Sequence, residues 1–200
     1  DVHYVKPGDH VITCLSVFCG HCEQCVTGHL SLCGEDEVNR GPEEEPRLSQ
    51  DGQSLEQFAR LGSFAEMMLV HEHAVVKIRE DMPSAQAALI GCGVTTGIGA
   101  VIHTAKVEPG ATVAVIGCGG IGLSTINGAA IAGASRIIAV DMVASKLELA
   151  RKFGATDVVD ASDGDAVAKV KELTGGGVHY SFEAIGLKVC AEQALSLIHI

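Results

Sequence analysis

A run of four cysteines constrains this chain more than any other feature. The segment CGHCEQCVTGHLSLC has the pattern Cx2Cx2Cx7C and holds Cys19, Cys22, Cys25 and Cys33 in one short, glycine-bearing stretch. Thiolates are soft ligands that select Zn²⁺, and four of them complete its tetrahedral shell. A complete shell leaves no position for water or substrate, so we predict a structural zinc site with no chemistry at the metal.

Disulfide bonds or buried thiols are the alternative interpretation of these four cysteines. We favour zinc because the first residues, DVHYVKPGDH, have neither the basic nor the apolar region of a signal peptide, and disulfides are rare in the cytosol. We therefore expect a cytoplasmic protein. Because the chain starts at Asp1 instead of Met, we also expect it to be a fragment. Outside the run, Cys14, Cys118 and Cys190 are expected to be buried thiols.

Composition excludes several classes of protein. The chain has 200 residues, of which 47% are hydrophobic, so it can bury one large core or two small ones. Its formal net charge of −11 argues against binding to nucleic acid, including a zinc-ribbon module, and against anionic membrane surfaces. We find no apolar run of the roughly 20 residues needed to span a bilayer. The sequence thus predicts no nucleic-acid partner and no membrane partner.

The first part of the chain has the pattern of short strands joined by polar loops. Residues 5–18 and 62–78 contain apolar, β-branched stretches, whereas the polar residues 34–57 predict a solvated loop. The acidic run Glu43 to Glu45 could be a partner site, but we interpret it as a solvated surface.

After Pro83 the pattern becomes helical, and from Thr112 onwards strand-like and helix-like stretches alternate. The strand-like stretches are TVAVI, RIIAV, DVV and VHYSFEAI, which are apolar almost throughout. Continuous apolar strands separated by helices are typical of a parallel sheet covered on both faces. We therefore predict an α/β fold with a doubly wound parallel sheet in the second part.

A glycine motif lies between the first of these strands and the helix that follows. Gly117, Gly119 and Gly122 have the GxGxxG spacing in TVAVIGCGGIGL. In dinucleotide-binding proteins the first glycine forms a tight turn and the second lets a pyrophosphate approach the backbone. The third allows close helix packing. A purely structural glycine loop is the alternative.

An acidic residue ends the next strand. Asp141 follows RIIAV, where a carboxylate accepts hydrogen bonds from ribose hydroxyls and repels a 2′-phosphate, so we predict NAD in preference to NADP. Lys146 could bond the same ribose, or it could be an exposed helix lysine.

The chain resembles the zinc-containing alcohol dehydrogenases of the medium-chain dehydrogenase/reductase family. The resemblance rests on the four-cysteine loop, the cysteine in GCGVTTG and the glycine motif followed by Asp141. The resemblance implies a partial GroES-like β domain over residues 1–92. It also implies an incomplete NAD-binding Rossmann domain over residues 93–194 and a cofactor set of structural zinc, catalytic zinc and NAD.

The resemblance also implies a second, catalytic zinc. Cys92 matches one of its ligands, and the other cysteine and a Gly-His-Glu motif would precede Asp1. His21, His29, His71 and His73 do not match that motif, so we interpret them as structural residues. By the same resemblance, further cofactor-binding residues are Gly120, Thr96, Ile121, Ile185 and Gly186. Ordinary packing is equally compatible with the last four, and a buried thiol is the alternative for Cys92.

The function implied is an NAD-dependent alcohol dehydrogenase that passes hydride between a zinc-bound alkoxide and the nicotinamide. The fragment itself is expected to be inactive. An S-(hydroxymethyl)thiol (formaldehyde) dehydrogenase and a polyol or threonine dehydrogenase are alternatives within the family. An alternative of another class is a protein that keeps the structural zinc and binds NAD but catalyses no reaction. The resemblance further implies an alcohol or aldehyde substrate and a homodimer or homotetramer.

The last residues carry a separate hypothesis. LSLIHI, residues 195–200, is the translation of a transposase sequence used in preparing sequencing libraries, so this segment could be an adapter artefact. We therefore assign His199 no role.

Overall fold

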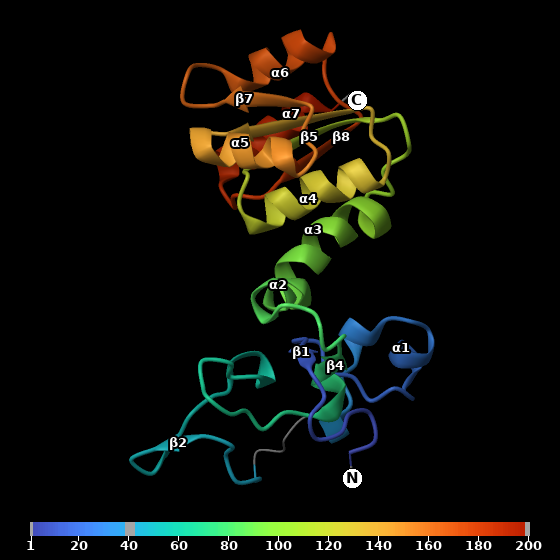
Figure 1. Ribbon diagram of the computed structural model, residues 1–200, viewed down its shortest axis with the longest axis vertical. Coiled ribbons are helices and arrows are strands. Elements are labelled where there is room, and N and C mark those ends of the chain that lie inside the picture. The colour runs from blue at the N-terminus through green and yellow to red at the C-terminus, as the bar shows by residue number, and fades with distance from the viewer. Residues whose placement is uncertain (1, 39–42, 199–200) are drawn as a thin grey trace. The chain divides into compact units, whose positions relative to one another are not determined.

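The structure, a computed structural model, describes residues 2–38 and 43–198 (Figure 1). It divides into two compact units, Asp1–Gly91 and Cys92–Ile200. Ile200 and His199 lie outside the described residues, so the adapter hypothesis for residues 195–200 falls partly beyond them.

Short antiparallel pairs make up the strands of the first unit. β1 (Val11–Thr13) pairs with β4 (Val75–Lys77), with Ile12 opposite Val76. The strand-like residues 5–18 and 62–78 therefore form strands over only three residues each. Glu72–Ala74, immediately before β4, is a turn of 3₁₀ helix (η4) instead of strand.

The polar stretch predicted as a loop contains a hairpin. β2 (Ser49–Gln50) pairs with β3 (Gln53–Ser54) through Asp51 and Gly52, whose φ angles are +51° and +77°. Two successive positive φ angles are typical of a type I′ turn, and Asp-Gly is one of the pairs that favour it. The prediction of a solvated loop over residues 34–57 is therefore wrong here in that these residues pair as strands, although they are exposed as expected. A turn of 3₁₀ helix (η3, Phe58–Arg60) follows.

The cysteine run folds into short helical turns around its own small core. These turns are α1 (Glu23–Val26), η1 (Leu30–Leu32) and η2 (Asp36–Val38). The buried residues of this core are Val17, Cys19, Cys25, Val38 and Ala74.

The segment that follows Pro83 is helical, as the sequence predicts. It comprises α2 (Ser84–Leu89), the π-helical turn η5 (Ile90–Val94), α3 (Thr95–Gly99) and the π-helical turn η6 (Ala100–Thr104). The expectation that no apolar run could cross a bilayer is wrong on length and composition. Ser84–Thr104 is a helical segment of 21 residues, and 18 consecutive residues of it have a mean hydropathy of 1.6. Core helices of soluble proteins meet the same two criteria.

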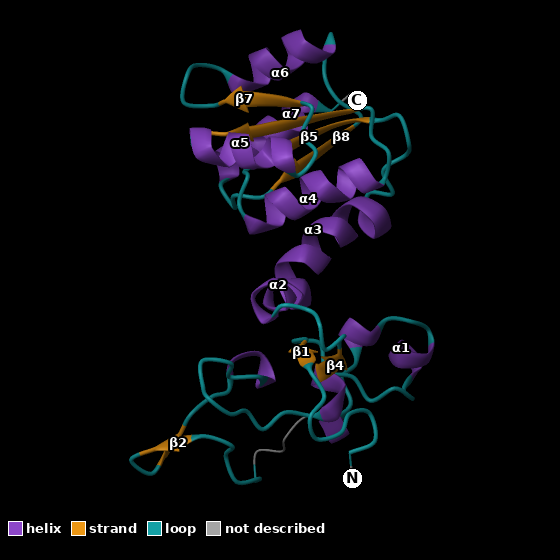
Figure 2. Cartoon of the chain, viewed as in Figure 1, coloured by secondary structure: helices purple, strands orange, loops and turns teal. Residues whose placement is uncertain are grey.

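A parallel sheet forms the centre of the second unit (Figure 2). Among the described residues its strand order is β7-β6-β5-β8, and every pairing in it is parallel. The strands are β5 (Thr112–Ile116), β6 (Arg136–Asp141), β7 (Asp157–Asp160) and β8 (Tyr180–Glu183).

Helices cover both faces of this sheet, which confirms the doubly wound fold. Val113 and Val115 of β5 pack with α4 (Gly120–Ile131) and α5 (Ala144–Lys152). Ala114 and Ile116 face the other way and pack with α6 (Ala166–Thr174) and α7 (Lys188–Leu197). Because neighbouring side chains on a strand point to opposite faces, an unbroken apolar strand is what a sheet covered on both faces requires.

Candidate functional site

The four cysteines of the run converge on one point. The Sγ atoms of Cys19, Cys22, Cys25 and Cys33 all lie within 4.8 Å of one another, and all four residues are free thiols. Ligands at the zinc–sulfur distance of about 2.3 Å in a tetrahedron are about 3.8 Å apart. The Sγ atoms of Cys19 and Cys25 are 3.8 Å apart, so this pair is already spaced as a zinc ion would hold it.

Backbone amides around the loop point at the sulfur atoms. The N–H of Cys22 donates to Sγ of Cys19 at 3.3 Å, and the N–H of Cys19 donates to Sγ of Cys33 at 3.3 Å. Amides of Glu35 and Cys19 lower the pKa of Cys33 to about 7, because they stabilise its thiolate.

One thiol of the set is much harder to ionise than Cys33. The backbone N–H of Cys25 favours the Cys22 thiolate, but burial and the three neighbouring sulfur atoms outweigh it and raise the pKa of Cys22 to about 12. Four thiolates at this spacing repel one another unless a cation lies between them. The donor set therefore fits a soft, tetrahedral cation such as Zn²⁺.

An ion pair that sequence reasoning missed lies beside the cysteine loop. Nε2 of His21 is 2.6 Å from Oε1 of Glu37, and this contact, together with the charge of Cys19, raises the pKa of His21. The potential metal-ligand atoms of His21, Glu37 and Cys19 also lie within 4.8 Å of one another. Neither His29 nor Cys92 joins a group of three or more metal-binding side chains among the described residues. Cys92 lies exposed in η5, so its role as a zinc ligand stays a prediction.

The glycine motif forms a turn at the end of β5 that admits no side chain at its first and third positions. Gly117 has a φ of +96°, and a Cβ atom there would lie 2.6 Å from Cγ1 of Ile185. A Cβ atom on Gly122 would lie 1.8 Å from the carbonyl oxygen of Gly117. Both positions therefore require glycine, which is what the tight turn and the close helix approach demand.

The middle of the motif faces open space. Neither Gly119 nor Gly120 has an atom within 4 Å of the position that a Cβ would take. Gly119 is the N-cap of α4 and offers no side chain to bond the first amides of that helix. Unpaired amides at a helix N-terminus bind phosphate groups, so this cradle fits the pyrophosphate of a dinucleotide.

Asp141 lies at the end of β6, beside the glycine turn. Its side chain is buried, with Oδ2 accepting a hydrogen bond from the N–H of Cys118 at 2.8 Å and Oδ1 accepting one from the N–H of Val143 at 3.0 Å. Nζ of Lys146 is 3.9 Å from Oδ2. Since each carboxylate oxygen can accept more than one hydrogen bond, Asp141 is oriented and still able to bind a ribose.

A second loop borders the glycine turn. Oε1 of Glu183, a residue that sequence reasoning did not single out, accepts hydrogen bonds from the N–H groups of Ile185 at 2.7 Å and Gly186 at 2.8 Å. The signal in the sequence was its position at the end of the apolar strand next to β5. Ile121 and Ile185 are 43% and 47% exposed, so both offer apolar surface near the loop.

Thr96 lies on a helix that packs against α4. A Cβ atom on its neighbour Gly97 would lie 2.5 Å from Cβ of Ser124, which brings α3 close to the first turns of α4. The structure thus gathers the glycine motif, Asp141, Lys146, Ile121, Ile185 and Gly186 around one end of the sheet, with Thr96 on the adjoining helix.

Two of the remaining cysteines are buried, as expected, and one is not. Burial, together with the charge of Asp141, raises the pKa of Cys118 to about 12, and burial also raises the pKa of Cys190. Cys14 is only half-buried. The two buried thiols are unreactive by this criterion.

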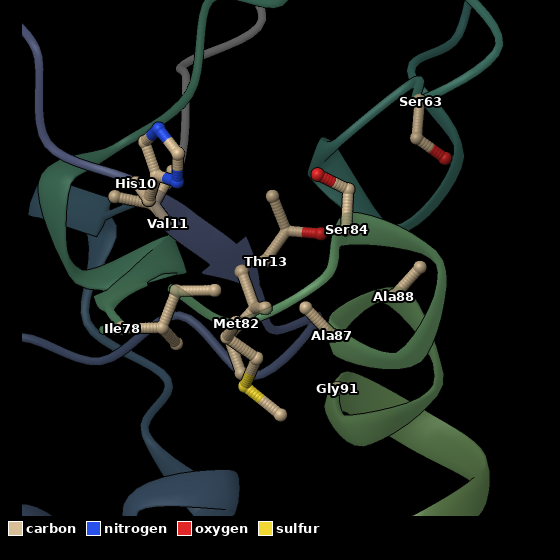
Figure 3. A pocket seen from close by; sticks show the side chains of 11 residues that line it. His10, Val11, Thr13, Ser63, Ile78, Met82, Ser84, Ala87, Ala88 and Gly91 are labelled. Carbon is tan, nitrogen blue, oxygen red and sulfur yellow. The ribbon is translucent and has the colours of Figure 1, made fainter. Parts of the chain in front are cut away.

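A cavity of about 460 Å³ lies in the first unit between β1 and α2 (Figure 3). His10, Thr13, Ser63, Met82 and Ser84 are among its lining residues. Among the described residues that line it, His10 is the only side chain that could bind a metal or transfer a proton, and no cysteine or carboxylate accompanies it. We assign no site to it.

Two family models match the chain. The model described as alcohol dehydrogenase GroES-like domain matches residues 1–80, and the model described as zinc-binding dehydrogenase matches residues 120–200. With the fold and the two candidate sites, they identify the class as that of the zinc-binding dehydrogenases. The chain belongs to the zinc-containing alcohol dehydrogenases of the medium-chain dehydrogenase/reductase family, whose cofactors are zinc and NAD.

Several proteins of known name are similar to this chain. A probable S-(hydroxymethyl)glutathione dehydrogenase 1 of Schizosaccharomyces pombe is 42% identical over 98% of the chain and 53% of its own length. An S-(hydroxymethyl)glutathione dehydrogenase of Synechocystis is 43% identical over 98% of the chain and 54% of its own length. The structure of benzyl alcohol dehydrogenase from Acinetobacter calcoaceticus aligns with a TM-score of 0.82 and 36% identity, covering all of this chain and 55% of that one. The chain spans about half the length of the curated relatives it matches.

Proposed function

We propose that this chain is part of an NAD-dependent alcohol dehydrogenase that oxidises an alcohol by hydride transfer to the nicotinamide. Residues 1–92 would supply the structural zinc loop and Cys92 to the catalytic domain. Residues 93–194 would bind the cofactor. The observation that carries the proposal is the turn in which Gly122 packs on Gly117 while Gly119 stays open beside Asp141.

The residues of the chain divide the work of binding. The amides at the start of α4 would hold the pyrophosphate, and Asp141 would accept hydrogen bonds from the ribose, with Lys146 beside it. Ile121, Ile185 and Gly186 would cover the cofactor and exclude water, and Thr96 would lie near the nicotinamide. When bound, the catalytic zinc supplies Lewis acidity to the alcohol oxygen and NAD accepts the hydride.

The four-cysteine loop has a different role in this proposal. Its ligand set is complete, so the metal there would hold residues 19–33 in place without touching substrate. Cys92 would contribute one thiolate to a separate, open site.

The relatives suggest the substrate class. Several of them are named S-(hydroxymethyl)glutathione dehydrogenase, so we favour the thiol adduct of formaldehyde over simple primary alcohols. Polyols and threonine are the alternative substrates within the family. The alternative of another class is a protein that keeps the structural zinc and binds NAD but catalyses no reaction. We further propose that the complete protein is a homodimer or homotetramer, as the resemblance implies, and that it is cytoplasmic.

The test is an assay of the complete gene product for NADH formation. Glutathione with formaldehyde should give the highest kcat/KM, and primary alcohols a lower one. NADH formation from polyols or threonine only would favour the family alternatives. A product that binds zinc and NAD but forms no NADH with any of these would support the binding protein instead. The Asp141→Ala variant, which should lose NAD affinity, is the matched control for signal that does not depend on the cofactor site.

A further inference from the structure

His73 packs directly against the start of the cysteine loop, although the sequence assigns it no function. Its ring stacks on that of Phe18, with centroids 4.6 Å apart and planes at 9°. Nδ1 of His73 is 2.7 Å from the carbonyl oxygen of Phe18. Because a carbonyl oxygen can only accept, this nitrogen must carry the proton and donate.

The hydrogen bond fixes one particular peptide group. Phe18 precedes Cys19, so the carbonyl that His73 holds and the N–H of Cys19 belong to the same planar unit. That N–H donates to Sγ of Cys33 at 3.3 Å. Holding the oxygen therefore aims the amide at a sulfur atom of the metal loop, and polarising the peptide strengthens that bond.

His73 is itself held in place from several sides. The backbone N–H of His73 donates to Nδ1 of His71 at 3.1 Å. The rings of His73 and Tyr4 meet edge to face, with centroids 6.1 Å apart. The next residue, Ala74, is fully buried in the core that contains Cys19 and Cys25. A ring fixed in this way can orient the peptide without an entropy cost at the moment of metal binding.

The other side of the ring leaves room for the turn of the loop. Gly20 has a φ of +93°, and even a Cβ atom added to it would come no closer than 4.0 Å to Cε1 of His73, so the glycine turn passes the ring without a clash. The ring thus stacks on Phe18 and lies near Gly20, the residues on both sides of Cys19.

We infer that His73 is a positioning residue of the four-cysteine loop: by fixing the Phe18–Cys19 peptide, it stabilises the metal-bound thiolates and slows release of the metal. This inference rests on the zinc loop that forms part of the proposed function. Partners of this kind in other metal sites typically change metal affinity by roughly 10- to 100-fold.

Zinc release from the full chain to an excess of a metallochromic chelator tests the inference. His73→Phe keeps an aromatic ring but loses the donor, and it should release zinc at least about 10-fold faster. His73→Asn, whose amide nitrogen takes about the place of Nδ1, should restore most of the parent rate. His10→Phe, a histidine change in the same unit on the cavity wall, should leave the rate unchanged.

Release at the parent rate from His73→Phe would overturn the inference, and so would His73→Asn releasing zinc as fast as His73→Phe. Nitrogen NMR of the unmutated, zinc-loaded chain gives an answer even if a variant fails to fold. It should show Nδ1 of His73 protonated, and protonation at Nε2 alone would refute the inference. A chain that binds no zinc would refute the zinc loop with it, whereas zinc binding without NADH formation would refute only the proposed activity.

Discussion

Gly119 and Gly122 belong to one turn but have different surroundings, so substitution should separate binding from stability. Gly122→Ala places a methyl group 1.8 Å from the Gly117 oxygen, and we expect it to cost at least about 3 kcal/mol in the free energy of unfolding. Gly119→Ala meets no atom within 4 Å and should leave stability nearly unchanged while it abolishes NAD binding. Urea unfolding and calorimetric titration with NAD measure the two effects. Equal stability losses in both variants would contradict the assignment.

Asp141 permits a second prediction at the scale of one residue. Replacing it with alanine removes the acceptor for the amides of Cys118 and Val143 and for a bound ribose. Because hydrogen bonds to charged groups contribute about 1.5–3 kcal/mol, the affinity for NAD should fall by about 10- to 100-fold. Lys146→Ala, which leaves the carboxylate in place, is the milder control. Unchanged NAD affinity in Asp141→Ala, measured by titration calorimetry, would argue against a ribose contact.

The same residues show what the sequence could predict. The roles of Gly117, Gly122 and Asp141 depend on local spacing beside an apolar strand, and the structure places them together as expected. Glu37 and the contacts of His73 depend on which loops meet in space. No local pattern encodes such meetings, because these side chains bond backbone or partners that other elements bring to them.

At the scale of secondary-structure elements, an ion pair joins β6 to β7. The guanidinium of Arg136 bonds both carboxylate oxygens of Asp157 at 2.9 and 3.0 Å, and it also donates to the carbonyl of Leu173 at the end of α6. The hydrogen bond from Arg136 lowers the pKa of Asp157.

A carboxyl group whose pKa is lowered on folding stabilises the protein above its ordinary pKa, here 3.8, and loses that effect as the pH falls through the lowered value. Asp157→Asn should therefore destabilise the chain by about 1 kcal/mol at pH 7, and the difference should shrink below pH 3.8. Asp81→Asn removes a more exposed pair with Arg79 and should have a smaller effect. Urea midpoints measured across pH check this, and a difference independent of pH would contradict it.

Elements also show where sequence patterns lose force. The strands of the parallel sheet, above all β5 and β6, contain runs of consecutive apolar residues, so their pattern predicted both the strands and the two covered faces. The hairpin at Asp51 and Gly52 is polar and exposed, and only its turn residues distinguish it from a loop. In the first unit, strands of three residues carry too little alternation to be located from sequence.

At the scale of the whole molecule, each of the two units contains its own candidate site. The cysteine loop lies within Asp1–Gly91 and the glycine turn within Cys92–Ile200. A ligand that binds only the folded form stabilises the unit that holds its site. Removing zinc with a chelator should therefore speed amide exchange in residues 17–38 and leave residues 112–141 unchanged.

NAD should have the converse effect and slow exchange in residues 112–141 alone. Hydrogen exchange read out by mass spectrometry measures both regions in one sample, so each ligand serves as the control for the other. A chelator that accelerates exchange equally in both regions would show that the two units do not respond separately.

The strand order of the sheet has a consequence for synthesis on the ribosome. β5, β6 and β7 can pair in the order in which they are translated, but β8 pairs with β5 only after α4, β6, α5, β7 and α6 have emerged. Until then, one edge of β5 stays open and apolar, which exposes the nascent chain to wrong pairing. This interval is where a chaperone, or a slow stretch of codons before Tyr180, would most affect the yield of native protein.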